Sequence, residues 1–270
     1  MKFTPGFRPL FISIVFSCLL AGFTTSCSTC CHQQPALPNT LTKPEQADGW
    51  KLLWDGRTAN GWHSPNATAF PNQSWSMRDG ELSVVTGGNA ESQAGGDIIT
   101  RDRYANFELV VDFKTTMGCN SGIKIFVQPN ISPIDKVTGK PAAVGSAIGM
   151  EFQILDDANH PDAKLGHDGN RTIGSLYDII PASKDKVVKP FGEWNHARIL
   201  SQGKHVEFWL NGRKTVEFER GSVAFREAVA HSKFKNIPDF GEWADGHILL
   251  QEHGSVVAFR NVKIRELANQ

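Results

Sequence analysis

The feature that most constrains the fold of this chain is an alternation of apolar and polar residues with a period of two. It is clearest at residues 205–210, where every second residue is apolar, before Asn211-Gly212 and a second alternating run at residues 214–218. An Asn-Gly pair between two alternating runs is a strong signal for a β-hairpin. The chain is therefore expected to contain a tight antiparallel hairpin with one buried face.

The same alternation recurs along most of the chain in short segments that turn residues separate. Short strands at regular spacing predict an all-β fold, a single sandwich or jelly roll of the lectin/glucanase type. Helical periodicity is scarce, and residues 223–231 are expected to form one short helix. Within residues 121–127, Val127 is expected to point inward, and Lys124 and Phe126 outward. The other expected strands are residues 75–77, 81–85, 107–113, 150–156, 247–253 and 256–264.

Residues 1–26 are interpreted as a bacterial lipoprotein signal and not as part of the fold. A positively charged start precedes an apolar run at residues 10–23, which is too short for a membrane span and typical of a signal-peptide core. Small residues then precede Cys27, which we expect to be acylated after cleavage, with Cys30 and Cys31 as alternatives. Ordinary signal cleavage and release is the competing interpretation.

The rest of the chain divides into a linker and one domain. Residues 27–47 are polar and contain prolines, which predicts a flexible tether, and residues 48–268 are expected to form the β-sandwich. The protein is thus predicted to be exported and held at the membrane by a lipid anchor, facing the periplasm or the cell surface. Cys119 is the one cysteine inside the domain, so we expect a structural thiol and no internal disulfide.

The charge balance argues against nucleic acid as a partner. The sequence has 28 Lys and Arg residues against 28 Asp and Glu residues, which gives a formal net charge of zero. A phosphate-binding surface usually shows as a basic excess. We therefore expect no nucleic-acid partner. Separately, no nucleotide cofactor is expected.

Two expected strands carry polar residues where a core-facing side chain would be apolar. Glu151 and Gln153 share one face of their strand, and Gln251 and His253 share one face of another. Lys124 lies on the polar face of a third strand. Polar side chains gathered on one sheet face line a groove and do not form a core. The sequence therefore predicts a polar groove on one sheet.

Six short motifs follow one another between Gly49 and Leu267. They are Leu53-Trp54-Asp55-Gly56 with Gly61-Trp62, Asn120-Ser121-Gly122-Ile123, Glu151-Phe152-Gln153-Ile154-Leu155-Asp156, Gly192-Glu193-Trp194-Asn195, Trp209-Leu210-Asn211-Gly212, and Leu250-Gln251-Glu252-His253-Gly254 with Phe259-Arg260-Asn261. Each motif alone is short, but in this order they resemble the motifs of the 3-keto-disaccharide hydrolase family. The segment 158–181 also resembles a longer insertion of some members, and we expect it to form a loop over the mouth of the groove.

The resemblance implies a concanavalin A-like jelly roll that acts on glycosides oxidised at C3. A ketone at C3 acidifies the C2 hydrogen, so that a modest base removes it and the C1 glycosidic oxygen leaves. Adding water back gives net hydrolysis. The resemblance thus implies a 3-keto-glycoside hydrolase or 1,2-lyase and hydratase. It also implies a separate sugar 3-dehydrogenase that supplies the ketone.

The chemistry needs a base, a group that holds the enolate oxygen and a proton source for the leaving group. The residues expected to supply these functions are Glu151, His253, Lys124 and Gln251. The residues expected to bind the sugar are Asn120, Gln153, Asp156, Tyr177 and Trp209. No cofactor is required by the sequence. A divalent metal acting as Lewis acid is left open, with Glu151, His253 and Asp156 as its candidate ligands.

Two other functions fit the same fold. One is a carbohydrate-binding module without turnover, in which tryptophans such as Trp209 stack on sugar rings. The other is a retaining glycoside hydrolase, which needs two carboxylates on the same face. Here the same-face neighbour of Glu151 is Gln153, an amide, which argues against direct hydrolysis. Single histidines such as His253 are also often structural, and Lys124 is a plausible ion-pair partner of Glu151.

If Cys27 carries the anchor, replacing it removes the site of acylation. We expect the Cys27→Ala variant, expressed in a bacterial host, to lose incorporation of a fatty-acid analogue that the unmodified chain retains. Cys30→Ala is the matched control and should label normally. Undiminished labelling of Cys27→Ala would assign the anchor elsewhere.

Overall fold

The computed structural model describes residues 1–3, 6, 37–85, 96–133, 139–140 and 146–268. Residues 36–270 form one compact unit of two antiparallel sheets packed face to face, which confirms the expected all-β sandwich. The expected signal peptide from residue 7 onward, including Cys27, lies outside the described residues. Among the described residues, no helix is long and apolar enough to span a bilayer.

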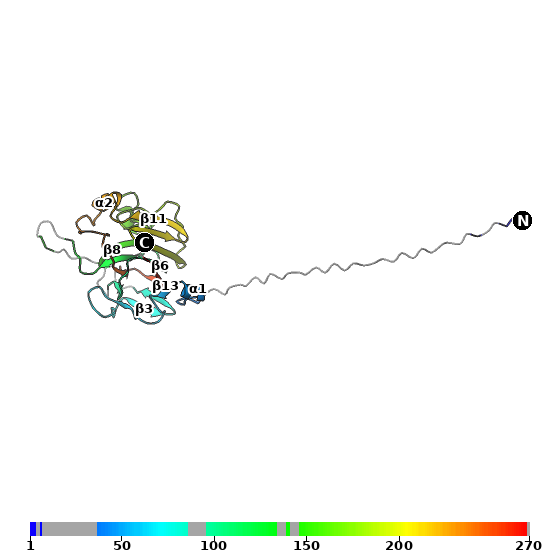
Figure 1. Cartoon of the computed structure of the whole chain (residues 1–270), viewed down its shortest axis with the longest axis horizontal. Helices are drawn as coiled ribbons and strands as arrows, with labels where there is room; N and C mark the ends of the chain where they lie inside the picture. The colour runs from blue at the N-terminus through cyan, green and yellow to red at the C-terminus, as the bar shows by residue number, and fades with distance from the viewer. Residues whose placement is uncertain (4–5, 7–36, 86–95, 134–138, 141–145, 269–270) are drawn as a thin grey trace. The chain divides into compact units, whose positions relative to one another are not determined.

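The larger sheet has eight strands. Its order is β11-β10-β9-β6-β13-β4-β3, with β1 added on β13, and Figure 1 shows β6 and β13 side by side. The predicted hairpin at residues 205–218 is present as β10 and β11. The strands are β1 (Trp50–Leu52), β3 (Trp75–Arg78), β4 (Glu81–Val84), β6 (Phe107–Thr115), β9 (Trp194–Gln202), β10 (His205–Leu210), β11 (Arg213–Glu219) and β13 (Val257–Glu266).

The smaller sheet has five strands in the order β2-β5-β12-β7-β8. In the part of the chain that the structure describes, helix is confined to three short segments, and α2 agrees with the helix expected at residues 223–231. The strands are β2 (Trp62–His63), β5 (Ile98–Thr100), β7 (Asn120–Gln128), β8 (Ile148–Leu155) and β12 (His247–Leu250). The helices are α1 (Lys43–Ala47), the 3-10 turn η1 (Pro161–Lys164) and α2 (Val223–Ala230).

The hydrophobic core lies between the two sheets. From β6 of the larger sheet, Phe107 and Phe113 are fully buried, and from β8 of the smaller sheet, Phe152 and Ile154 are fully buried in the same cluster. Side chains alternate along a strand, so Glu151 and Gln153 point away from the core. The smaller sheet therefore presents an outer face that carries polar side chains.

The predicted alternation in β7 is wrong at its end. Phe126 has a φ of 54° and its register with the neighbouring strands shifts there, which marks a β-bulge. The bulge turns the Phe126 side chain into the main core, and Val127 instead packs with Ile99 and Leu249 in a separate cluster. Upstream of the bulge the alternation holds, and Lys124 points to the outer face.

The start of the domain differs from the expected boundary at residue 48. The buried side chain of Asn39 accepts a hydrogen bond from the Asn261 backbone (2.8 Å) and donates one to the Gly80 carbonyl (2.9 Å). Glu45 of α1 pairs with Lys263 of β13, and Figure 1 shows α1 next to that strand. Residues 37–47, assigned to the tether by their composition, are thus docked on the sandwich.

Candidate active site

A cavity of about 250 Å³ lies on the outer face of the smaller sheet. Three adjacent strands form its base: β7 in the middle, β8 on one side and β12 with the residues that follow it on the other. Seven of the nine residues expected in catalysis or sugar binding line this cavity. They are Asn120, Lys124, Glu151, Gln153, Tyr177, Gln251 and His253.

The charged centre of the cavity is an ion pair between Lys124 and Glu151. The two residues are directly opposite in the β7–β8 register, and the Lys124 Nζ lies 3.6 Å from Glu151 Oε2. Only 7% and 6% of the two side chains is exposed. A buried pair of this kind is strongly coupled, since removal of one partner leaves the other charge uncompensated.

Lys124 is held in place by a chain of hydrogen-bonded groups at the side of the cavity. Its ammonium donates to the Ser146 hydroxyl and to the Ala147 carbonyl, and Ser146 in turn donates to Asp97. Asp97 also accepts the backbone N–H of Glu252 at 3.0 Å, immediately before His253. Burial raises the pKa of Asp97 to about 6, although Lys124 and Ser146 oppose that shift. Asp97 thus connects two sides of the cavity.

Gly122 of β7 lies between residues that line the cavity. It lies opposite Gln153 in the register, and its carbonyl accepts the Gln251 backbone N–H at 3.0 Å. A Cβ at this position would lie 2.4 Å from Glu151 Oε1, closer than real Cβ atoms approach other atoms. The glycine is therefore required for the Glu151 carboxylate to lie across β7.

Two amide oxygens in the cavity wall have no partner within the described part of the protein. They belong to Gln153 and Gln251, whose residues are 1% and 4% exposed. A buried acceptor without a hydrogen bond costs about 1–3 kcal/mol. Two such acceptors beside one cavity fit a ligand that carries several hydroxyl donors.

The insertion at residues 158–181 extends the edge of the smaller sheet, whereas we expected a loop over the mouth. The backbone N–H of Tyr177 donates to the Glu151 carbonyl at 3.0 Å, and that of Gln153 donates to the Ser175 carbonyl at 3.1 Å. This pairing brings the Tyr177 ring to the cavity wall. Its hydroxyl donates to Asp162 at 2.8 Å, and burial together with that bond raises the pKa of Tyr177.

The sequence did not indicate the part of the cavity wall that the loop after α2 forms. Lys233, Phe234 and Ile237, from the loop that follows α2, line the cavity. Ser146 reaches it from the connection between β7 and β8. No alternation or motif marks these residues, because they lie in irregular segments that only the tertiary fold brings to the sheet.

Asp156 is not at the cavity, which corrects its predicted role. Its carboxylate accepts the backbone N–H of Gly118 at 2.7 Å, and those of Ala158 and Asn159 at 3.1 Å each. Burial alone would raise the pKa of Asp156, but these hydrogen bonds hold it below its usual range. Asp156 therefore closes a turn, and the three expected metal ligands Glu151, His253 and Asp156 do not form a ligand set.

Trp209 is also elsewhere, on the outer face of the opposite sheet. Its indole N–H donates to Glu207 at 2.8 Å, and Arg198 lies 5.4 Å from the ring centroid. The period of two correctly turned it outward, but it could not show which sheet β10 joins. Trp209 cannot contact a sugar bound in the cavity.

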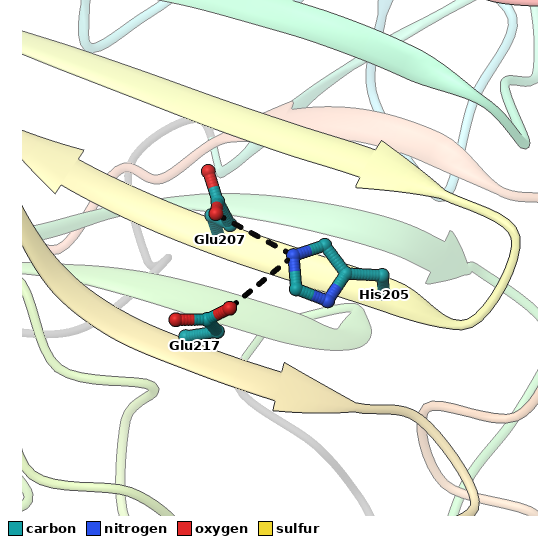
Figure 2. A group of neighbouring side chains, drawn as sticks. All are labelled: His205, Glu207 and Glu217. Carbon is teal, nitrogen blue, oxygen red and sulfur yellow. Dashed lines mark hydrogen bonds and ion pairs between the residues drawn. The ribbon is translucent and has the colours of Figure 1, made fainter.

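The Trp209 face also carries a group of potential metal ligands, His205, Glu207 and Glu217, shown in Figure 2. Their ligand atoms lie within 4.8 Å of one another. However, the Lys214 ammonium lies 3.2 Å from Glu207 and pairs with Glu217 as well. The Lys214 ammonium thus pairs with both carboxylates, and the group is an ion-pair network on the surface.

Comparison with known proteins decides the family. Residues 49–265 match the model of the 3-keto-alpha-glucoside-1,2-lyase-like domain. The chain is also 34% identical over 241 residues to the 3-keto-disaccharide hydrolase of Bacteroides thetaiotaomicron, which covers 85% of this chain and 82% of that protein. The chain belongs to this family. Family membership makes it an enzyme of the hydrolase type.

Two solved structures with similar sequences have the same β-sandwich fold. Both are provisionally assigned glycosyl hydrolases of Parabacteroides distasonis. One is 31% identical, with a TM-score of 0.69 over 86% of this chain and 100% of that chain. The other is 32% identical, with a TM-score of 0.56 over 81% of this chain and 99% of that chain.

Gly122→Ala should displace the Glu151 carboxylate. We expect turnover to fall about a hundredfold, the usual cost of misplacing a reacting group by about 1 Å, with a loss of about 1–3 kcal/mol in the free energy of unfolding. Steady-state kinetics and denaturant unfolding measure the two effects. Gly246→Ala, which would crowd the Phe126 backbone, controls for destabilisation alone. Unchanged turnover in Gly122→Ala would show that the Glu151 position is not critical.

Proposed function

We propose that this enzyme cleaves 3-keto-glycosides by elimination and hydration in the cavity on the smaller sheet. The observation that carries the proposal is the composition of that cavity. It combines one carboxylate, one imidazole, two ammonium groups and unpartnered amide oxygens around Gly122. Family membership supports the substrate class, since the curated relative is named a 3-keto-disaccharide hydrolase.

The reaction begins with removal of the C2 proton, which the neighbouring C3 ketone acidifies. We assign this step to Glu151, whose carboxylate lies against Gly122 and lines the cavity. The electron pair first forms the C2–C3 enolate and then a C1–C2 double bond, as the C1–O bond to the leaving group breaks. His253, half-buried at the cavity, supplies the proton that the leaving oxygen takes up.

Water then adds to the resulting 3-keto-2-hydroxyglucal. Its oxygen bonds to C1, and a proton returns to C2, so the sum of the two steps is hydrolysis of the glycosidic bond. Gln153 and Gln251 line the cavity, and rotation of their amide groups towards the sugar would pair their buried, unpartnered oxygens with sugar hydroxyls. Asn120 and Tyr177 complete the polar wall around the sugar.

The cavity is less suited to a retaining glycoside hydrolase. Such enzymes place two carboxylates about 5–5.5 Å apart. Among the described residues that line the cavity, Glu151 is the sole carboxylate, and the same-face neighbour Gln153 cannot act as a nucleophile. A single base with nearby cations favours chemistry in which the substrate supplies an acidic C–H.

The proposed chemistry also places the enzyme after an oxidation. An unmodified glycoside has no C3 ketone, so a separate sugar 3-dehydrogenase must act first. With the predicted lipid anchor at Cys27, both reactions would take place at the cell envelope of a bacterium.

Glu151→Gln and His253→Ala should each lower turnover of a 3-keto-glucoside by about a hundredfold or more, the scale of a positioned acid or base. Both should retain the circular dichroism spectrum of the unmodified enzyme. Release of the aglycone measures turnover. His231→Ala is a matched control, because His231 lies exposed at the end of α2, outside the cavity.

The unoxidised glucoside should be inert with all of these proteins, because its C2 hydrogen is not acidic enough for a carboxylate. Equal cleavage of the oxidised and the unoxidised sugar would contradict elimination and favour a conventional hydrolase. Binding of the keto sugar without any turnover would favour a carbohydrate-binding module.

A further inference from the structure

The cavity contains two lysines whose surroundings differ. The Lys124 ammonium donates to the Ser146 hydroxyl and to the Ala147 carbonyl, and it forms an ion pair with the Glu151 carboxylate at 3.6 Å. Its charge is thus balanced by Glu151, and two of its three N–H donors are in hydrogen bonds. Lys124 is therefore already paired with an anion and tied to the chain of groups that leads to Asp97.

Lys233, in the loop that follows α2, has aromatic neighbours instead of an anion. Its Nζ lies 4.2 Å from the centroid of the Tyr177 ring and 5.2 Å from that of Phe234. Across the described residues, this ammonium makes no hydrogen bond and no ion pair, so aromatic faces are its contacts. Aromatic rings attract a cation but leave its N–H donors unused.

The fold fixes this lysine at the cavity. Its backbone N–H donates to Asp178 at 2.7 Å, which ties the loop after α2 to the insertion that carries Tyr177. The adjacent Phe234 stacks on Phe240 with ring centroids 4.4 Å apart. Surrounding protein lowers the pKa of Lys233, and Glu151 opposes the shift. Lys233 is still exposed to solvent, so a ligand in the cavity can reach its ammonium, which has no anion among the described residues.

We propose that Lys233 is a catalytic residue that binds the C3 oxygen of the substrate as this oxygen gains negative charge. The inference rests on the proposed elimination, in which the C2 electron pair is delocalised onto that oxygen. A donor aimed at developing charge stabilises the transition state more than the ground state. Lys124 instead positions Glu151, and each lysine has one function.

Lys233→Met keeps the length of the side chain but removes the charge. We expect it to lower kcat for a 3-keto-glucoside by about a hundredfold, with KM changed less than about threefold, because the interaction forms mainly in the transition state. Lys233→Arg should retain most of the activity. Lys235→Met is the matched control, since Lys235 is exposed two residues along the loop and does not line the cavity.

A second variant separates a catalytic role from a structural one. Lys233→Ala leaves room for a small cation, and added ethylammonium should raise the kcat of this variant at least about tenfold. A folding defect would not respond to the added cation. The assignment would be overturned if the kcat of Lys233→Met stays within about threefold of that of the unmodified enzyme. It would also be overturned if Lys233→Met loses activity and ethylammonium does not rescue Lys233→Ala. If the unmodified enzyme itself fails to turn over the 3-keto-glucoside, the proposed function fails, and this inference fails with it.

Discussion

The structure of the site depends on the register of β7 between its two neighbours. Pairing with β8 sets Lys124 opposite Glu151 and Gly122 opposite Gln153, and the segment after β12 brings Gln251 beside Gly122. A shift of one residue would turn the polar side chains into the core. The fully buried Phe152 and Ile154 on the inner face prevent that shift, so the packing of the core determines the composition of the cavity.

The two lysines of the cavity differ, because Lys124 is paired with a carboxylate and Lys233 is not. Lys124, Ser146 and Asp97 form a hydrogen-bonded chain that holds Glu151 and, through the Glu252 backbone, the segment that leads to His253. Lys233, in the irregular loop after α2, supplies a charge that no anion among the described residues balances. This division suits elimination, in which the base must stay in place while negative charge develops on the C3 oxygen, two bonds from C2.

Much of this arrangement was predictable from the sequence, because alternation with a period of two identifies both the strands and their outward residues. It placed Glu151, Gln153, Lys124 and Gln251 on polar faces correctly. The alternation gave wrong or no predictions where the position of a side chain depends on the tertiary fold. The bulge at Phe126 reverses the faces, Trp209 points outward from the other sheet, and Lys233 lies in an irregular loop without a recognisable motif.

The central claim is that the enzyme removes the C2 proton of a 3-keto sugar. The most direct measurement is proton NMR of a 3-keto-glucoside incubated with the enzyme in deuterated water, in comparison with Glu151→Gln. We expect deuterium at C2 of the released 3-keto-glucose, formed by the unmodified enzyme at the rate of aglycone release and much more slowly by the variant. Release of the aglycone with the C2 hydrogen fully retained would contradict the claim.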